Sequence, residues 1–298
     1  MINVNLVFDQ QNARSTCLFL VIHLKLLIMT KTNVPKKIIN FIAATLFISL
    51  VGSFFSGLNT LNAQAFYLGA KGGWSLPELS GGNNEISKGW KSRSAFNFGV
   101  LASDELTKKF ALQIEVNYAS QGGRKNGIQP LYDGAVPGLP TGVPFYANFK
   151  SDAILNYIEV PVIAKYVFLQ THSQRFYIDA GPYAGYLLNA RNKTSGTSSI
   201  FTDKNGTVLM IPNPQNPDQY IPLPAQSFDA NTNITSDIKK FNFGINGGLG
   251  VGQNLGNGNL FLDIKGYYGF LNIQKNPVNG KNNSGALVVS VGYAVKID

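Results

Sequence analysis

Cysteine and histidine are almost absent from this chain of 298 residues, which contains one cysteine, Cys17, and two histidines. A single cysteine can form no internal disulfide, and so few cysteines and histidines cannot build a tetrahedral zinc site. Beyond residue 65 the only histidine is His172, so any Ser-His-Asp triad would depend on that one residue. We therefore expect no metal, no cofactor and no enzymatic activity.

Charged residues are also scarce, at 14% of the chain, where soluble domains carry about 25%. The formal net charge is +9, but five of the 25 basic residues and one of the 16 acidic residues precede residue 66. The other basic residues are spread along the sequence, whereas nucleic-acid binding needs them clustered on one face or element. The composition therefore argues against nucleic acid as a partner.

Long apolar runs are missing too, apart from one near the N-terminus. Two lysines at 36–37 precede an apolar run over 38–51, and Ala63-Gln64-Ala65 has the small-x-small spacing of a cleavage site. This pattern predicts a signal peptide over 29–65 and a mature chain that begins at Phe66.

An uncleaved signal anchor is the alternative, because the apolar run extends to about Gly57 and is long enough to span a bilayer. Residues 1–28 hold a second, poorer apolar run. Since Met29 opens a complete signal peptide by itself, we interpret 1–28 as an upstream extension produced by an early start codon. Export directs the remaining domain, 66–298, to the cell envelope.

From residue 66 onward the apolar residues recur with period two, which is typical of strands. In Phe110–Tyr118 every second residue is apolar, and the residues between them are small or polar. Most of these segments approach the ~9–11 residues that a tilted strand needs to cross a membrane. Eight segments alternate in this way: 68–76, 96–102, 110–118, 158–168, 176–188, 241–251, 260–270 and 287–295.

The connections between these segments alternate strictly between short and long. The short ones are 103–109, 169–174 and 253–259, and the long ones are 77–91, 121–152, 189–238 and 272–284. All short turns therefore lie at one end of the sheet and all long loops at the other. This predicts an all-β fold, an eight-stranded antiparallel up-and-down transmembrane β-barrel with short periplasmic turns and long extracellular loops.

A soluble up-and-down barrel shows the same alternation, with its apolar face turned inward. Segment 241–251 distinguishes the soluble barrel from the membrane barrel. On its non-apolar face, every even position from Asn242 to Gly250 is either asparagine or glycine. Such a face makes a poor hydrophobic core but fits a narrow lumen. Aromatic residues near the strand ends, such as Trp74 and Tyr268, also favour a membrane barrel.

Eight strands enclose a lumen that their own side chains fill, so we expect a packed polar network and no diffusion pore. Lys165 and Asp179 fall opposite or diagonal to each other across a hairpin near His172, and we predict that they are in contact. The other charges should find cross-strand partners, because unpaired charges in a confined interior are costly. The predicted network comprises Glu115, Glu159, Lys165, Asp179, Asp263 and Lys265.

Two prolines interrupt the predicted strands, Pro161 and Pro182. Because proline has no amide donor and a closed barrel has no free edge, we expect a bulge or a missing ladder bond near one of them.

The two longest loops, 121–152 and 189–238, are the candidate contact surfaces for protein partners, because a barrel holds its loops at the cell surface. The prolines of 211–224 predict an extended, polyproline-like stretch. Loop carboxylates, including a weak calcium-like spacing that starts at Asp203, leave open a carboxylate-only site.

Several motifs resemble one family of membrane barrels. Residues 157–166 read YIEVPVIAKY, followed by Ala-Gly-Pro-Tyr at 180–183, a glycine-rich segment at 243–250 and Val-Gly-Tyr at 291–293. This series is similar to the PorT-like outer-membrane β-barrel proteins of the Bacteroidetes. The resemblance implies an outer-membrane location with lipid around the barrel, and some members of that family take part in protein secretion or gliding.

The sequence thus favours a non-enzymatic outer-membrane barrel with a surface or envelope role in secretion or adhesion. The alternative is a small-ligand-binding barrel, either soluble in the periplasm or acting as a surface receptor.

Overall fold

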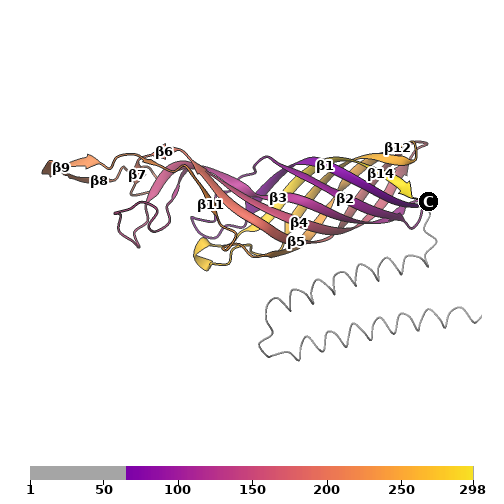
Figure 1. Ribbon diagram of the computed structural model, residues 1–298, viewed down its shortest axis with the longest axis horizontal. Helices are drawn as coiled ribbons and strands as arrows, with labels where there is room; N and C mark the ends of the chain where they lie inside the picture. The colour runs from indigo at the N-terminus through magenta and orange to yellow at the C-terminus, as the bar shows by residue number, and fades with distance from the viewer. Residues whose placement is uncertain (1–64, 298) are drawn as a thin grey trace, which may run out of the picture. The chain divides into compact units, whose positions relative to one another are not determined.

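The computed structural model describes residues 65–297; the predicted extension 1–28 and all but the last residue of the predicted signal peptide 29–65 lie outside the described residues. Eight long strands dominate this part of the chain (Figure 1). They are β1 (Ala65–Ser80), β2 (Ala95–Glu105), β3 (Phe110–Pro130), β4 (Tyr146–Gln170), β5 (Gln174–Ser195), β12 (Phe241–Leu255), β13 (Gly258–Gly269) and β14 (Asn283–Ile297). Among the described residues no helix is both long and apolar enough to cross a membrane.

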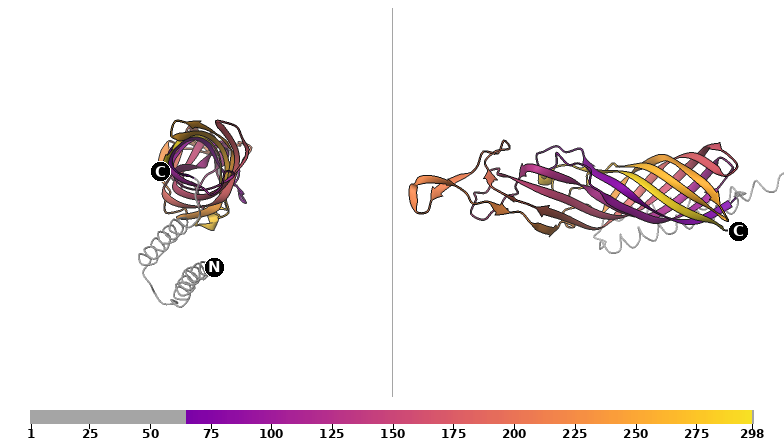
Figure 2. Two further views of the ribbon diagram at one scale, coloured as in Figure 1. Left: turned by 90° about the vertical axis from the view of Figure 1, so that its right-hand side faces the viewer. Right: turned by 90° about the horizontal axis from the view of Figure 1, so that it is seen from above.

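The eight strands form a closed antiparallel ring, which Figure 2 shows end-on. The ring closes because β1 pairs with β14 and β4 pairs with β5, so that Ala70 lies opposite Tyr293 on one side and Val100 on the other. Closure leaves no strand edge exposed to lipid. Each predicted segment lies within one of these strands, except that 260–270 extends one residue beyond β13, and the predicted eight-stranded barrel is confirmed.

The apolar face of every long strand points outward. In β2, Phe96, Phe98 and Val100 are 74%, 55% and 58% exposed, whereas the intervening Asn97 is 4% exposed. The same division holds in β12, where the asparagines and glycines of the even positions line the interior. An apolar outer surface of this kind needs lipid around it, which excludes the soluble barrel.

Both strand prolines lie where the ladder is interrupted. Pairing between β4 and β5 stops after Pro161↔Tyr183 and resumes at Ala164↔Ala180, so Pro182 has no ladder partner on β4. Pairing between β3 and β4 also skips Pro161. The expected loss of ladder bonds is confirmed, and the register shifts of the β4–β5 pair lie elsewhere, next to Asn156 and Val167.

Strands β3, β4 and β5 continue well beyond the barrel body on the side of the long loops (Figure 1). The prediction that 121–152 and 189–238 are loops is therefore wrong at their ends, because 121–130, 146–152 and 189–195 are paired strand. The reason is that no lipid surrounds these extensions. Their outward face is polar, and the period-two apolar signal disappears although the backbone ladder continues.

The far end of these extensions has a small hydrophobic core of its own. Val136, Phe145, Ala147 and Ile200 are buried there, and leucines from four neighbouring positions pack against them. The rings of Phe149 and Phe228 stack with their centroids 4.8 Å apart. Short strands surround this core: β6 (Thr197–Ser198), β7 (Ile200–Phe201), β10 (Gln226–Ser227) and β11 (Ala230–Asn233). We call this core, the strand extensions and their loops the extracellular extension.

The proline-rich stretch forms a hairpin, and the expectation that it stays extended is wrong. Strand β8 (Met210–Asn213) pairs antiparallel with β9 (Asn216–Pro222), with Ile211 opposite Ile221. Proline is tolerated because each strand of an isolated pair has one free edge, where no amide donor is needed.

Candidate functional site

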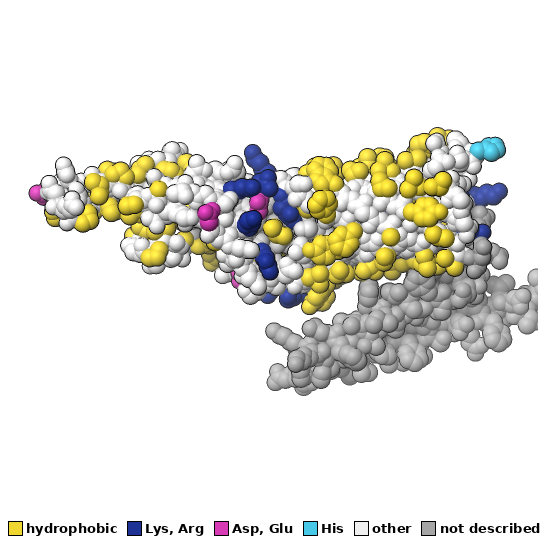
Figure 3. Space-filling model, turned by 45° about the horizontal axis from the view of Figure 1, so that its top comes forward, with side chains coloured by type: hydrophobic (Ala, Val, Ile, Leu, Met, Phe, Trp, Pro, Cys, Tyr) yellow, Lys and Arg dark blue, Asp and Glu magenta, His cyan; other side chains and the backbone are white. Residues whose placement is uncertain are grey.

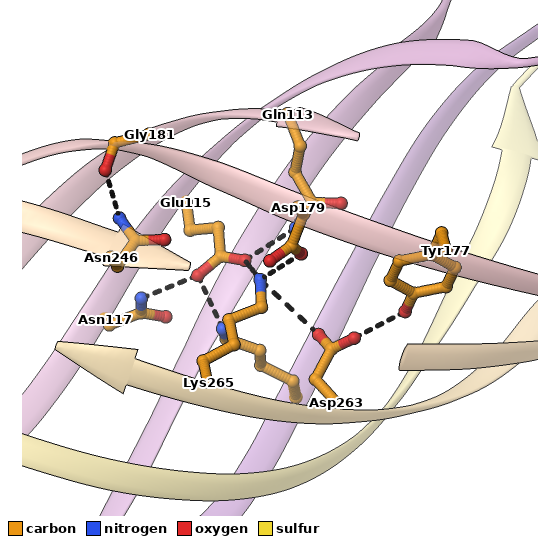
Figure 4. A network of polar contacts seen from close by, with 10 residues as sticks. Gln113, Glu115, Asn117, Tyr177, Asp179, Gly181, Asn246, Asp263 and Lys265 are labelled. Atoms are coloured by element: carbon orange, nitrogen blue, oxygen red, sulfur yellow. Dashed lines mark hydrogen bonds and ion pairs between the residues drawn. The ribbon is translucent and has the colours of Figure 1, made fainter. Parts of the chain in front are cut away.

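A buried cluster of charges occupies the middle of the barrel, and Glu115 on β3 lies at its centre (Figure 4). Its carboxylate is 2.5 Å from the Nζ atom of Lys71 on β1 and 3.3 Å from that of Lys265 on β13. The side-chain amides of Gln113 and Asn117, two residues away on either side, donate to the same carboxylate at 2.5 and 2.8 Å. Every second residue of β3 points inward, which is why these three side chains meet.

Lys265 extends the cluster to the opposite wall (Figure 4). Its Nζ atom is 2.9 Å from the carboxylate of Asp179 on β5 and 3.6 Å from that of Asp263 on its own strand. The hydroxyl of Tyr177 donates to Asp263. One ammonium group thus connects three carboxylates that come from three strands, so each charge is compensated in an interior that excludes bulk water.

Lys165 does not form the ion pair predicted for it. The backbone register is as expected, with Lys165 directly opposite Asp179, but Asp179 pairs with Lys265. The ammonium of Lys165 lies over the ring of Tyr177, 4.4 Å from its centroid, and 5.5 Å from the centroid of Phe261. Because the barrel is narrow, a lysine reaching across the lumen competes successfully with a neighbour in the sheet.

Glu159, the remaining predicted residue, lies apart from the central cluster. It is 1% exposed and accepts a hydrogen bond of 2.9 Å from the side chain of Gln121 on β3. The structure thus places all six predicted side chains toward the interior and joins Glu115, Asp179, Asp263 and Lys265 directly. Sequence reasoning missed Lys71, although the alternation of 68–76 puts that residue on the inward face.

An apolar plug closes the extracellular end of the lumen. Leu79, Leu155, Leu187 and two loop residues, Ile238 and Ile273, are 4% exposed or less and pack together. Below them Tyr183 and Tyr267 meet edge to face, with centroids 5.6 Å apart. The expected polar filling therefore holds for the middle of the barrel only, since apolar and aromatic side chains fill the end below the long loops.

A small hollow remains at the end that carries the short turns. Its volume is about 60 Å³, and its lining includes Lys165, Tyr177 and Phe261. A space of that size holds a few water molecules. Arg175 and Glu105 form an ion pair at its rim. At this hollow the Lys165 ammonium contacts the aromatic rings of Tyr177 and Phe261 and no carboxylate among the described residues.

Outward aromatic residues lie near both ends of the barrel body. Phe98 stacks on Tyr118 at 4.9 Å near the long loops, and Phe110 contacts Tyr166 at 5.0 Å near the short turns. Figure 3 shows hydrophobic side chains over the barrel body and Lys and Arg side chains gathered just beyond it. The two aromatic zones match the girdles that membrane barrels place at the two interfaces.

The loop carboxylates of the described residues do not gather into a metal site. Among residues 65–297 no group of three or more His, Cys, Asp or Glu side chains could hold a metal ion. Asp203 closes a turn, where its carboxylate accepts from the amide of Asn205 at 2.8 Å and from the hydroxyl of Thr207 at 2.8 Å. Hydrogen bonds from Thr207 lower the pKa of Asp203. His172 is exposed in the turn between β4 and β5.

An apolar outer face, aromatic girdles, short turns at one end and long loops at the other define an outer-membrane β-barrel. Residues 62–275 match the family model described as "Outer membrane protein beta-barrel domain", and the chain belongs to that family. No curated protein matches the chain.

Solved structures of outer-membrane proteins are similar to the chain. The attachment invasion locus protein Ail of Yersinia pestis is 12% identical, with a TM-score of 0.34, and the match covers 78% of this chain and 99% of Ail. Neisserial surface protein A is 16% identical, with a TM-score of 0.35, and the match covers 79% and 99% of the two chains. The translocator domain of NalP from Neisseria meningitidis is 6% identical, with a TM-score of 0.28 and coverage of 85% and 96%.

Proposed function

We propose that this protein is a non-enzymatic surface protein of the PorT-like type found in Bacteroidetes, which binds a protein partner through its extracellular extension in secretion or adhesion. The observation that carries the proposal is the core of the extension, in which Phe145, Ala147 and Ile200 are buried. A loop that only shields the barrel needs no core. A core is needed to hold a contact surface in a fixed shape.

The hairpin β8–β9 is the contact element that we propose. Met210 and Tyr220 are 46% and 64% exposed on this hairpin. Exposed aromatic residues and methionine are typical of protein interfaces. The filled lumen supports the same proposal over the small-ligand alternative, because the hollow of about 60 Å³ has no room for a ligand larger than a few waters.

Removal of the hairpin tests this function. The amide of Leu223 donates to the carbonyl of Leu209 at 3.0 Å, so a Gly-Ser link can replace 210–222 and leave the core in place. A photo-crosslinking amino acid at position 220 of the intact chain, expressed at the cell surface, should give a discrete crosslinked protein. The deletion variant should lose that partner in co-purification.

The matched control carries the crosslinker at position 132, where Tyr132 is exposed on another loop. The deletion variant and the two chains that carry the crosslinker should all keep heat-modifiable gel mobility, which reports a folded barrel. Retention of the partner by a folded deletion variant would refute the assignment to this hairpin.

A further inference from the structure

The outward side chains of β3, β4 and β5 change in a fixed order where these strands leave the barrel body. Tyr118, Ile158 and Tyr186 lie opposite one another on the three strands, and the two tyrosines belong to the outward aromatic zone. An interfacial aromatic row of this kind marks the edge of the hydrocarbon layer.

A row of small polar side chains follows directly. The hydroxyl of Ser120 donates to the side chain of Asn156 at 2.9 Å, and the amide of Asn156 donates to the side chain of Asn189 at 2.9 Å. On each strand these residues are the next ones to point outward after the aromatic row. On β5 the step is three residues instead of two, because the β4–β5 register shifts there. The surface therefore becomes polar within about 7 Å along the strands.

Basic side chains follow over the next outward positions: Arg191 lies in the next row, opposite Ile154, and Arg124 and Lys193 lie one row further. Asp152 on β4 lies between Arg124 on β3 and Lys193 on β5, while Arg191 and Lys150 lie on either side of this row. We call Arg124, Lys150, Arg191 and Lys193 the basic patch. Figure 3 shows Lys and Arg side chains gathered at this level of the molecule.

One carboxylate cannot neutralise this patch. Asp152 is 2.6 Å from Arg124 and 3.5 Å from Lys150, yet the side chains of these two cations stay 43% and 41% exposed. Arg191 and Lys193 are exposed and form no ion pair with a carboxylate of residues 65–297. Four positive charges against one negative charge leave the patch at +3.

We propose that the basic patch binds the phosphate groups of outer-leaflet glycolipids. Guanidinium groups bind phosphate oxygens in a bidentate manner, and ammonium groups add charge. The height of the patch favours a lipid over a soluble anion, because Arg191 and Lys193 are two and four residues, or about 7 and 14 Å along the strand, beyond Asn189 in the polar row. A phosphate on a headgroup is held at this height by its own acyl chains.

Binding of lipid A to the purified full-length protein in detergent tests the proposal. The key variant is R191Q/K193Q, since neither side chain has an ion-pair partner to lose. The matched control is K108Q/K109Q, which removes two exposed charges from the turn between β2 and β3, at the other end of the barrel. Heat-modifiable mobility shows that each variant is folded.

We expect R191Q/K193Q to weaken binding of fluorescent lipid A at least fivefold and K108Q/K109Q to leave it unchanged. Dephosphorylated lipid A should bind the native chain and R191Q/K193Q equally. Equal losses in the two variants, or no loss in R191Q/K193Q, would overturn the proposal. A preference for a soluble sulfated polysaccharide over lipid A at equal charge would also overturn it and assign the patch to a soluble polyanion.

Discussion

At the scale of single residues, Lys265 connects the charges of the lumen, because its ammonium group lies within 3.6 Å of carboxylates from three strands. Alternation assigns a side chain to the inner or outer face, and for all six predicted network residues the inner face is correct. The partner of each charge depends on how the barrel closes, which brings Lys265 against Glu115, 150 residues away along the chain. No local sequence pattern reports a contact between residues so far apart along the chain, and this is why the predicted Lys165–Asp179 pair is wrong.

Replacing Lys265 should therefore destabilise the barrel strongly. In K265M the carboxylates of Asp179 and Asp263 lose their ammonium partner, and breaking a buried pair on one side costs about 3–5 kcal/mol. Urea unfolding of the refolded protein in detergent, followed by gel mobility, measures this loss.

The matched control is K165M, which removes a lysine from the same lumen without taking an ion pair from a carboxylate. Its effect should be well below that of K265M. Equal destabilisation by the two substitutions would show that the ion pairs of Lys265 contribute nothing specific.

At the scale of the strand, the sequence pattern predicts the transmembrane part of each strand but does not detect the part outside the membrane. Segments such as 110–118 are visible because lipid on one side and a polar lumen on the other impose alternation. Residues 121–130 continue the same strand, yet they carry Arg124 and Asn126 on the outer face. Without lipid the alternation of hydropathy has no cause, and a strand outside the membrane looks like a loop.

The close approach of β4 to β5 at the gap in their ladder depends on a glycine, which gives a prediction for this element. A Cβ atom on Gly181 would lie 1.8 Å from the carbonyl oxygen of Val162, a backbone atom that cannot move aside cheaply. We expect G181A to lower the free energy of unfolding by about 1–3 kcal/mol.

Gly72 on β1 provides the comparison, because a Cβ atom there meets nothing within 4 Å. G72A should stay within about 0.5 kcal/mol of the native chain. If G181A proved as stable as G72A in the same urea titration, the close approach of β4 to β5 would be wrong.

At the scale of the whole molecule, the barrel is a sealed support for a structure outside the membrane. An apolar plug, a network of ion pairs and a hollow of about 60 Å³ succeed one another along the lumen. The strand extensions then carry a second core beyond the outward aromatic zone. This arrangement requires the long loops and the short turns to face opposite sides of the outer membrane.

Labelling of single cysteines on intact cells tests this requirement most directly. With Cys17 replaced by serine the chain has no other cysteine, so D218C at the tip of the extension and H172C in a short turn are each unique targets. A membrane-impermeant maleimide should label D218C on intact cells and H172C only after lysis. Labelling of H172C on intact cells, or protection of D218C until lysis, would contradict this orientation of the barrel.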